Sequence, residues 1–285
     1  MTASPDNCSS KTNLSIAQAC AITFQGNASN NLQQDAFFFL DHWYQEDLGV
    51  MAVTPVVSPF CLAVSDGVAS SNYSQHCSKA VVKAVSRLWS EHKSIRSETI
   101  HQLINKTKHS SKRHGAAATL AMIVGELNSG GTIKARITHV GDSRIYWLPK
   151  GAAQWQCLTR DHNLLNELID QQAHEQGRQA EFTDYNREEM AGSLYSITEC
   201  FALTSDSSYL NSEAPESNSC TIEVNSSDCI LVCTDGIHDL VPSHEWQTVS
   251  AETDLQYWLI TLKNQVYNSE GDAYDNGTAI LLRFD

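Results

Sequence analysis

Four aspartates in this 285-residue chain stand at the ends of short apolar runs. The runs are rich in β-branched residues and have the length of buried strands. An apolar strand gains nothing from a carboxylate at its tip, so each acid must serve as a turn residue, a cap or part of a site. The pattern favours carboxylates that converge on hard cations at the rim of a sheet. The four places are Phe60 to Ser65 followed by Asp66-Gly67, Ile137 to Val140 followed by Gly141-Asp142, Ile230 to Val232 followed by Thr234-Asp235-Gly236, and Asp275-Asn276-Gly277 before Thr278 to Phe284.

Two further aspartates, Asp35 and Asp239, extend this set of acids over most of the chain. Carboxylate oxygens are the ligands that Mg²⁺ and Mn²⁺ prefer. Two such ions roughly 4 Å apart lower the pKa of a shared water and neutralise a phosphoryl oxygen. The sequence lacks a Walker glycine loop, a Gly-x-Ser-x-Gly elbow and a His-Glu-x-x-His helix. The residues therefore favour metal-assisted hydrolysis of a phosphate ester.

The composition limits the partners and the compartment. A net charge of −14 argues against a nucleic-acid or anionic-membrane surface, because both need a basic footprint. The longest apolar run, around Ala116 to Val124, is too short to cross a bilayer, and the N-terminus has no signal-peptide pattern. Nine scattered cysteines without Cys-x-x-Cys pairs favour reduced thiols over disulfides or zinc. A cytoplasmic protein that binds no membrane and no nucleic acid is expected.

The order of elements favours an α+β sandwich. The tail is expected at residues 1–16, and a single domain at 17–285. Residues from His174 to Ser219 lack clear periodicity and indicate an excursion from the sheet. Strands, a helix pair, a strand meander, helices and a closing strand follow one another, which predicts two packed sheets with helices outside. The expected strands include Ala17 to Phe24, Ala36 to Leu40, Ala116 to Leu127, Thr132 to Val140 and Arg144 to Leu148, and the expected helices are Ser74 to Trp89, Ser94 to Lys108, Asp161 to about Gln172, Ser243 to Val249 and Leu255 to Val266.

Two local expectations concern single side chains. Asp161 is expected to cap the helix that it begins. His238 lies between Asp235 and Asp239. It is a candidate for the rim of a site, and a purely structural role for it stays open. His139 and His162 are expected to be structural.

Six motifs follow one another along the chain: QDAF at Gln34 to Phe37, VSDG at Val64 to Gly67, VGDSRIYWL at Val140 to Leu148, LTRDHNLLNEL at Leu158 to Leu168, CTDGIHDLV at Cys233 to Val241 and DNGTAILL at Asp275 to Leu282. In these motifs and in their order the chain resembles the metal-dependent serine/threonine protein phosphatases of type 2C (the PPM family), especially their bacterial members. The resemblance covers roughly Ala17 to Phe284.

The resemblance implies a fold of two antiparallel sheets flanked by antiparallel helix pairs, an α/β/β/α sandwich, with a flap subdomain at about 165–219. It implies hydrolysis of phosphoserine and phosphothreonine in proteins by a hydroxide that bridges two Mn²⁺ or Mg²⁺ ions. The residues implied to surround these two ions and to be catalytic are Asp35, Asp66, Asp235 and Asp275, with the backbone carbonyl of Gly67.

Asp142 would hold a weaker third ion together with Asp235 and Asp239. Asn276 would orient Asp275, and Arg144 would hold neighbouring carboxylates in place. The resemblance also implies a phosphorylated protein substrate, an opposing serine/threonine kinase and a bacterial setting. A monomer is expected.

Two positions depart from the family's pattern. The family arginine that grips the substrate phosphate, five residues before the first metal aspartate, is here Asn30, and no Lys or Arg occurs between Thr12 and Ser78. The glutamate usually found before that aspartate is Gln34. A working enzyme with weakened phosphate binding is expected, since the metal aspartates are all present. The alternatives are a degenerate phosphatase that binds a phosphoprotein or partner without turnover, and a structural sandwich whose acids are only turns.

Overall fold

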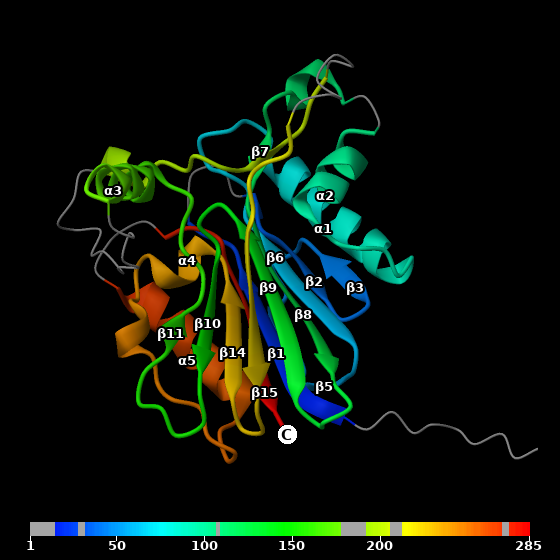
Figure 1. The fold of residues 1–285 in the computed structure, drawn as a ribbon, viewed down its shortest axis with the longest axis vertical. Coiled ribbons are helices and arrows are strands. Elements are labelled where there is room, and N and C mark those ends of the chain that lie inside the picture. The colour runs from blue at the N-terminus through cyan, green and yellow to red at the C-terminus, as the bar shows by residue number, and fades with distance from the viewer. Residues whose placement is uncertain (1–14, 28–31, 107–108, 178–191, 206–212, 270–273) are drawn as a thin grey trace, which may run out of the picture.

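The computed structural model describes residues 15–27, 32–106, 109–177, 192–205, 213–269 and 274–285. Asn30, residues 1–14 of the expected tail, and residues 178–191 and 206–212 of the expected flap lie outside these ranges. In the described part, two antiparallel β-sheets pack face to face, and helices cover their outer faces (Figure 1). The predicted α+β sandwich is confirmed.

The first sheet contains the first and last of the described strands side by side. Its order is β11-β10-β14-β15-β1-β4, and β5 also pairs with β1. β1 begins at Ser15, inside the expected tail, and pairs with β15 from Ala17↔Phe284 to Phe24↔Gly277. The strands of this first sheet are β1 (Ser15–Phe24), β4 (Gly49–Val50), β5 (Thr54–Val57), β10 (Arg144–Leu148), β11 (Gln156–Cys157), β14 (Cys229–Cys233) and β15 (Gly277–Phe284).

The second sheet has the order β13-β9-β8-β6-β2-β3. A turn at Asn128 to Gly131 joins β8 and β9, and Asn128 Oδ1 stabilises it by accepting hydrogen bonds from the backbone N–H groups of Gly130 and Thr132. The strands are β2 (Ala36–Phe39), β3 (His42–Tyr44), β6 (Phe60–Ser65), β8 (Leu120–Leu127), β9 (Ile133–Val140) and β13 (Asn218–Val224), while β7 (Ala117–Ala118) pairs separately with β12 (Phe201–Ala202).

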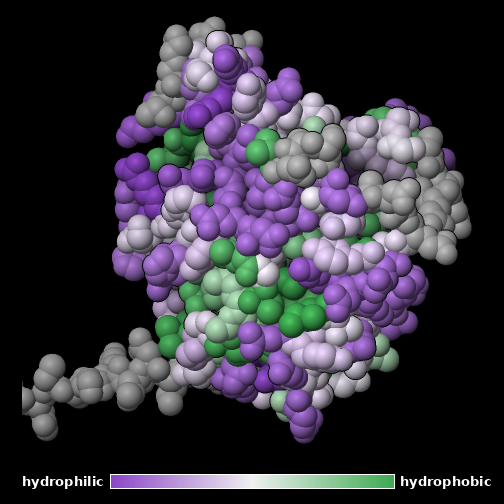
Figure 2. Space-filling view, turned by 180° about the vertical axis from the view of Figure 1, so that it is seen from behind, coloured by the Kyte–Doolittle hydropathy of each residue, from purple (hydrophilic) through white to green (hydrophobic). Residues whose placement is uncertain are grey.

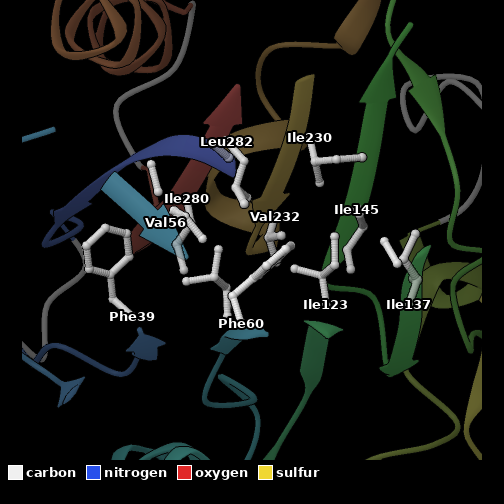
Figure 3. Close-up of a cluster of buried hydrophobic side chains, with 14 of the residues drawn as sticks. Phe39, Val56, Phe60, Ile123, Ile137, Ile145, Ile230, Val232, Ile280 and Leu282 are labelled. Carbon is white, nitrogen blue, oxygen red and sulfur yellow. The ribbon is translucent and has the colours of Figure 1, made fainter. Parts of the chain in front are cut away.

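Three buried apolar clusters define the layers. The middle cluster fills the space between the sheets, where Figure 3 shows side chains such as Phe60 and Ile123 facing Val232 and Ile280. Another lies between the second sheet and α1 (Ser74–Ser90) with α2 (Ser97–Ile104). The third lies between the first sheet and α5 (Leu255–Asn268). Each fully buried Ile, Leu or Phe contributes about 1.5–3 kcal/mol, so this stack fixes the strand ends that carry the acids.

The structure corrects three local predictions. α3 (Leu164–Glu175) begins after Asn163, whose Oδ1 accepts from the Asn166 N–H, so Asn163 and not Asp161 is the cap. Asp161 instead accepts two hydrogen bonds of 2.8 Å from the Arg144 guanidinium. The expected helix from Ser243 to Val249 is only a 3₁₀ turn, Ser243–Glu245. The expected Ser94 to Lys108 helix is reduced to α2, with its described end at Ile104.

The face seen from behind carries a hydrophobic area surrounded by hydrophilic surface (Figure 2). The segment that includes β4 and β5, at the edge of the first sheet, contributes Leu48, Val53 and Val57 as exposed large hydrophobic side chains. Among the described helices, none has the length and apolarity needed to cross a bilayer.

Candidate metal centre

Strand register places the acids from both sheets at one end of the sandwich. β2 and β6 pair up to Ala36↔Ser65, so Asp35 and Asp66 lie just beyond the same end of that ladder. β10 and β14 pair up to Arg144↔Cys233, so the chains that continue from this end carry Asp142 and Asp235. One carboxylate oxygen from each of Asp66, Asp142 and Asp235 lies within 4.8 Å of the others. The sheets therefore bring together residues that are far apart in the sequence.

Asp35 belongs to the same cluster and is almost fully buried. The Thr234 hydroxyl donates to Asp35 Oδ2 at 2.9 Å. The described residues supply no hydrogen-bond donor to Asp35 Oδ1, although this atom is buried. A buried carboxylate oxygen without a donor is costly unless a cation meets it. Thr234 was missed in the sequence, where a threonine directly before a strand-end aspartate is the only signal.

The electrostatics of the cluster also fit a cation. The pKa of Asp35 is raised to about 6, mainly by burial and also by the Asp275 charge, while hydrogen bonds with Asp66, Thr278 and Thr234 oppose the rise. Burial and then the charges of Asp235, Asp35 and Asp142 raise the pKa of Asp66 well above its usual value. Like charges so close favour protonation unless a cation offsets them. The donor set is all oxygen, which suits Mg²⁺ or Mn²⁺.

The pKa values of Asp235 and Asp275 are raised as well. Burial, followed by the charges of Asp239, Asp142 and Asp275, raises the pKa of Asp235 well above its usual value. Burial also raises the pKa of Asp275, opposed by a hydrogen bond from the Asn276 backbone and reinforced by the Asp239 charge. Asp235 and Asp239 are four residues apart across α4 (Asp235–His238), so the short helix turns both toward one side.

Gln34 acts through the start of α1. Its Nε2 donates to Ser74 Oγ at 2.6 Å, and its backbone oxygen accepts from the Ser78 hydroxyl. Gly67 is buried beside this contact and forms a bridge with Ala118. Gln34 therefore ties the segment that contains Asp35 to α1. Both bonds involve serine hydroxyls, so a neutral glutamine is sufficient to form them.

Asn276 contacts Asp275 through its backbone. The Asn276 N–H donates to Asp275 Oδ1 at 2.7 Å. Its side chain instead joins two points of the β1–β2 connection, accepting from the Gly26 N–H and donating to the Leu32 carbonyl at 2.9 and 3.0 Å. Asn276 thus links the end of β15 to the connection that leads to Asp35.

Gly236 lets α4 approach this strand end. A Cβ at position 236 would lie 1.9 Å from the Asn276 backbone oxygen. Real Cβ atoms do not come so close to a backbone atom, so the position requires glycine.

We predict that Gly236→Ala lowers the free energy of unfolding by about 1–3 kcal/mol, because α4 must move away from the Asn276 backbone. Urea unfolding followed by circular dichroism measures this change. Gly192→Ala is the matched control, since its added methyl group meets no atom within 4 Å, and a change below about 0.5 kcal/mol is expected. Equal effects of the two substitutions would contradict the packing described for α4.

Comparisons with known proteins agree with this arrangement. The sequence model of protein phosphatase 2C matches residues 28–265. No curated protein sequence matches the chain. Solved structures match with high similarity of fold but low sequence identity.

The serine/threonine phosphatase Stp1 from Staphylococcus aureus matches with a TM-score of 0.68 and 17% identity over 94% of each chain. The Mycobacterium tuberculosis serine/threonine phosphatase PstP matches with a TM-score of 0.65 and 17% identity over 95% of this chain and 100% of that one. A structure of the PstP catalytic domain in complex with two manganese ions matches with a TM-score of 0.62, 18% identity, and coverage of 94% and 99%.

The family match spans well over half of the chain, and the structural matches cover nearly all of both partners. The acids of the matched motifs meet at one end of the sandwich. The chain belongs to the protein phosphatase 2C family of metal-dependent serine/threonine protein phosphatases.

Proposed function

We propose that this chain hydrolyses phosphoserine and phosphothreonine in proteins, using divalent Mn²⁺ or Mg²⁺ held by the carboxylate cluster. The observation that carries the proposal is the convergence of Asp66, Asp142 and Asp235 within 4.8 Å, next to the buried Asp35. Like charges are gathered here without an evident structural benefit, as expected of a cation site.

The residues divide between two groups of ligands. Asp35, Asp66, Asp235 and Asp275, with the Gly67 carbonyl, would hold two ions, and Asp142 with Asp235 and Asp239 would hold a weaker third. Ions bound there would lower the pKa of a water nucleophile and neutralise the phosphoryl oxygens.

The protein's part is to hold this geometry. Thr234 fixes Asp35 through one oxygen and leaves the other for a ligand contact. Asn276 fixes Asp275 through its backbone N–H, and Gln34 ties the Asp35 segment to α1. Ser65 and Asp66 are held to Thr119, through a 2.6 Å bond from the Ser65 hydroxyl and a 3.1 Å bond from the Asp66 N–H. Water would supply the proton that the leaving alkoxide needs.

The proposal is tested with phosphothreonine, phosphoserine and phosphotyrosine peptides of one sequence. Phosphate release that requires Mn²⁺ or Mg²⁺ and that is faster for the first two peptides is expected. Release from phosphotyrosine alone, or release that is insensitive to metal chelation, would contradict it.

A second candidate function is a degenerate phosphatase that binds a phosphoprotein without turnover. Asn30 and Gln34 favour it, because they replace an arginine and a glutamate of the family's pattern. The acids disfavour it, because a protein that no longer hydrolyses phosphate has no need for the whole set. The proposed phosphatase activity includes a phosphoprotein partner and an opposing kinase. It also includes a cytoplasmic setting and a single catalytic domain with a flap beside the site.

We predict that Asn30→Arg lowers the Michaelis constant for a small aryl phosphate about tenfold. A charge-assisted hydrogen bond to phosphate contributes about 1.5–3 kcal/mol, and we expect the introduced arginine to recover only part of this free energy. Asn30 lies outside the described residues. Asn30→Met serves as the control, because methionine approaches the length of arginine without its charge. Steady-state kinetics at saturating Mn²⁺ measures both variants. An unchanged Michaelis constant in Asn30→Arg would show that the lost arginine does not limit binding.

A further inference from the structure

The turn that carries Asp142 leaves the β-ladder before that residue. β10 and β14 pair only up to Arg144↔Cys233, because β14 then continues through Thr234 into α4. The backbone carbonyl of Asp142 lies beyond the last residue pair of this ladder. His238 contacts it from α4, since the His238 Nε2 lies 3.2 Å from the Asp142 backbone oxygen.

The other nitrogen of the same ring faces a second acid of the cluster. His238 Nδ1 lies 3.2 Å from Asp239 Oδ1, and only 1% of the His238 side chain is exposed. The ring also lies beside Tyr146, with the ring centroids 6.4 Å apart. His238 directly precedes Asp239 at the end of α4, so its bond to the Asp142 carbonyl ties this helix to the turn that carries Asp142.

A second histidine holds the same turn from the opposite direction. The backbone N–H of Gly141 donates to the ring atom His162 Nδ1 at 3.0 Å, and the backbone N–H of His162 donates to the Gly141 carbonyl at 3.0 Å. Gly141 has φ +89°, and a Cβ there would lie 2.6 Å from Thr119 Cγ2. The turn therefore stays attached through Gly141 when the His238 contact is lost, and the spacing between Asp142 and Asp239 is what changes.

We propose that His238 is a positioning residue that fixes Asp142 and Asp239 relative to one another and so sets the affinity of the weaker cation between them. This inference rests on the proposed function. The Nε2 of His238 faces a carbonyl, which only accepts hydrogen bonds, so this nitrogen carries a proton and donates it. Because Asp239 directly follows His238, this bond sets the distance between Asp239 and the turn that carries Asp142.

The test is a Mn²⁺ titration followed by electron paramagnetic resonance of the free ion, on wild type, His238→Leu, His238→Gln and His238→Asn. We expect His238→Leu to weaken the weakest class of Mn²⁺ binding about 10–100-fold, as for other residues that orient ligands. The tighter class should change less than threefold. Gln places an amide nitrogen near the position of Nε2, so His238→Gln should retain most of the affinity. Asn does not reach the carbonyl and should not.

His101→Leu is the matched control, because His101 is a buried histidine of α2, in the outer helix layer. Its Mn²⁺ binding should equal that of wild type. If His238→Leu does not fold, the comparison of the Gln and Asn variants decides the question. Unchanged weak binding in folded His238→Leu, or equal losses in the Gln and Asn variants, would overturn the positioning role. Wild type that neither binds Mn²⁺ nor hydrolyses phosphate would instead refute the proposed function.

Discussion

Replacing Asp235 by Asn is expected to reduce Mn²⁺-dependent phosphate release on the order of a thousandfold. Asp235 lies between both proposed groups of ligands, because its carboxyl interacts with Asp66, Asp142, Asp239 and Asp275. A cation that stabilises transition-state charge contributes several kcal/mol, and about 4 kcal/mol corresponds to three orders of magnitude in rate. Asn keeps the size of the side chain and removes its charge, so the loss reports on the cation. Turnover of an aryl phosphate against Mn²⁺ concentration measures the effect.

Asp228→Asn is the matched control for this variant. Asp228 is also buried, but its carboxylate accepts hydrogen bonds from the backbone N–H groups of Lys150 and Asn225, at the opposite end of β14. Its replacement should cost stability and leave turnover within about threefold below the melting temperature. An Asp235→Asn enzyme as active as the Asp228→Asn enzyme would contradict the assignment of the cluster.

Mn²⁺ is expected to raise the melting temperature by about 5–10 °C for each site at which its concentration is a hundredfold above the dissociation constant. Binding to the folded state alone then contributes about 2.7 kcal/mol per site. For a chain of this size, each kcal/mol shifts the melting temperature by roughly 2–4 °C. Asp66→Asn should abolish most of this shift. Thermal unfolding with Mn²⁺ and with a chelator measures it.

The metal-free protein should show the opposite effect of the same substitution. The folded-state pKa of Asp35 is raised from 3.8 to about 6, so the folded state binds more protons than the unfolded state between these values. Stability from this group is complete below pH 3.8 and is lost as the pH rises through about 6. The Asp66 charge, whose pKa is raised in the same direction, adds to the repulsion.

Asp66→Asn is therefore expected to melt at a higher temperature than wild type in chelator, by a margin that grows from pH 4 to pH 7. His162, whose pKa burial lowers to about 4, acts in the opposite direction, because it is neutral in the fold and costs stability as the pH falls below 6.5. The difference between variant and wild type at each pH cancels this contribution. A variant less stable than wild type in chelator at every pH would show that the acids do not repel one another as described.

Elements with a strong apolar pattern could be predicted from the sequence. The strand Phe60–Ser65 lies where a short apolar run predicts it, and the helix Ser74–Ser90 lies where helical spacing predicts it, since burial decides both. β13 was missed, because most of Asn218–Val224 is exposed and polar at the sheet edge, where pairing with β9 replaces burial as the cause of the strand. Asp161 was assigned to a helix start because local sequence does not reveal that Arg144 lies opposite it.

In the candidate site, too, some features could be predicted from the local sequence and others depend on tertiary packing. The acids could be listed from the sequence because each follows or precedes an apolar run, but only the strand register shows that Asp35 and Asp66 continue one ladder. The contacts of Thr234 with Asp35 and of His238 with the Asp142 carbonyl depend on where separate strands end. Such contacts are set by tertiary packing, and spacing along the chain does not encode them.

The central claim is that the carboxylates form a site for divalent cations, and calorimetric titration of the metal-free protein with Mn²⁺ tests it most directly. Wild type should bind at least two ions per chain, with the binding lost or strongly weakened in Asp66→Asn and retained in Asp228→Asn. Absence of binding to wild type from micromolar to millimolar Mn²⁺ would contradict the claim and leave the aspartates as turn residues of an acidic sandwich.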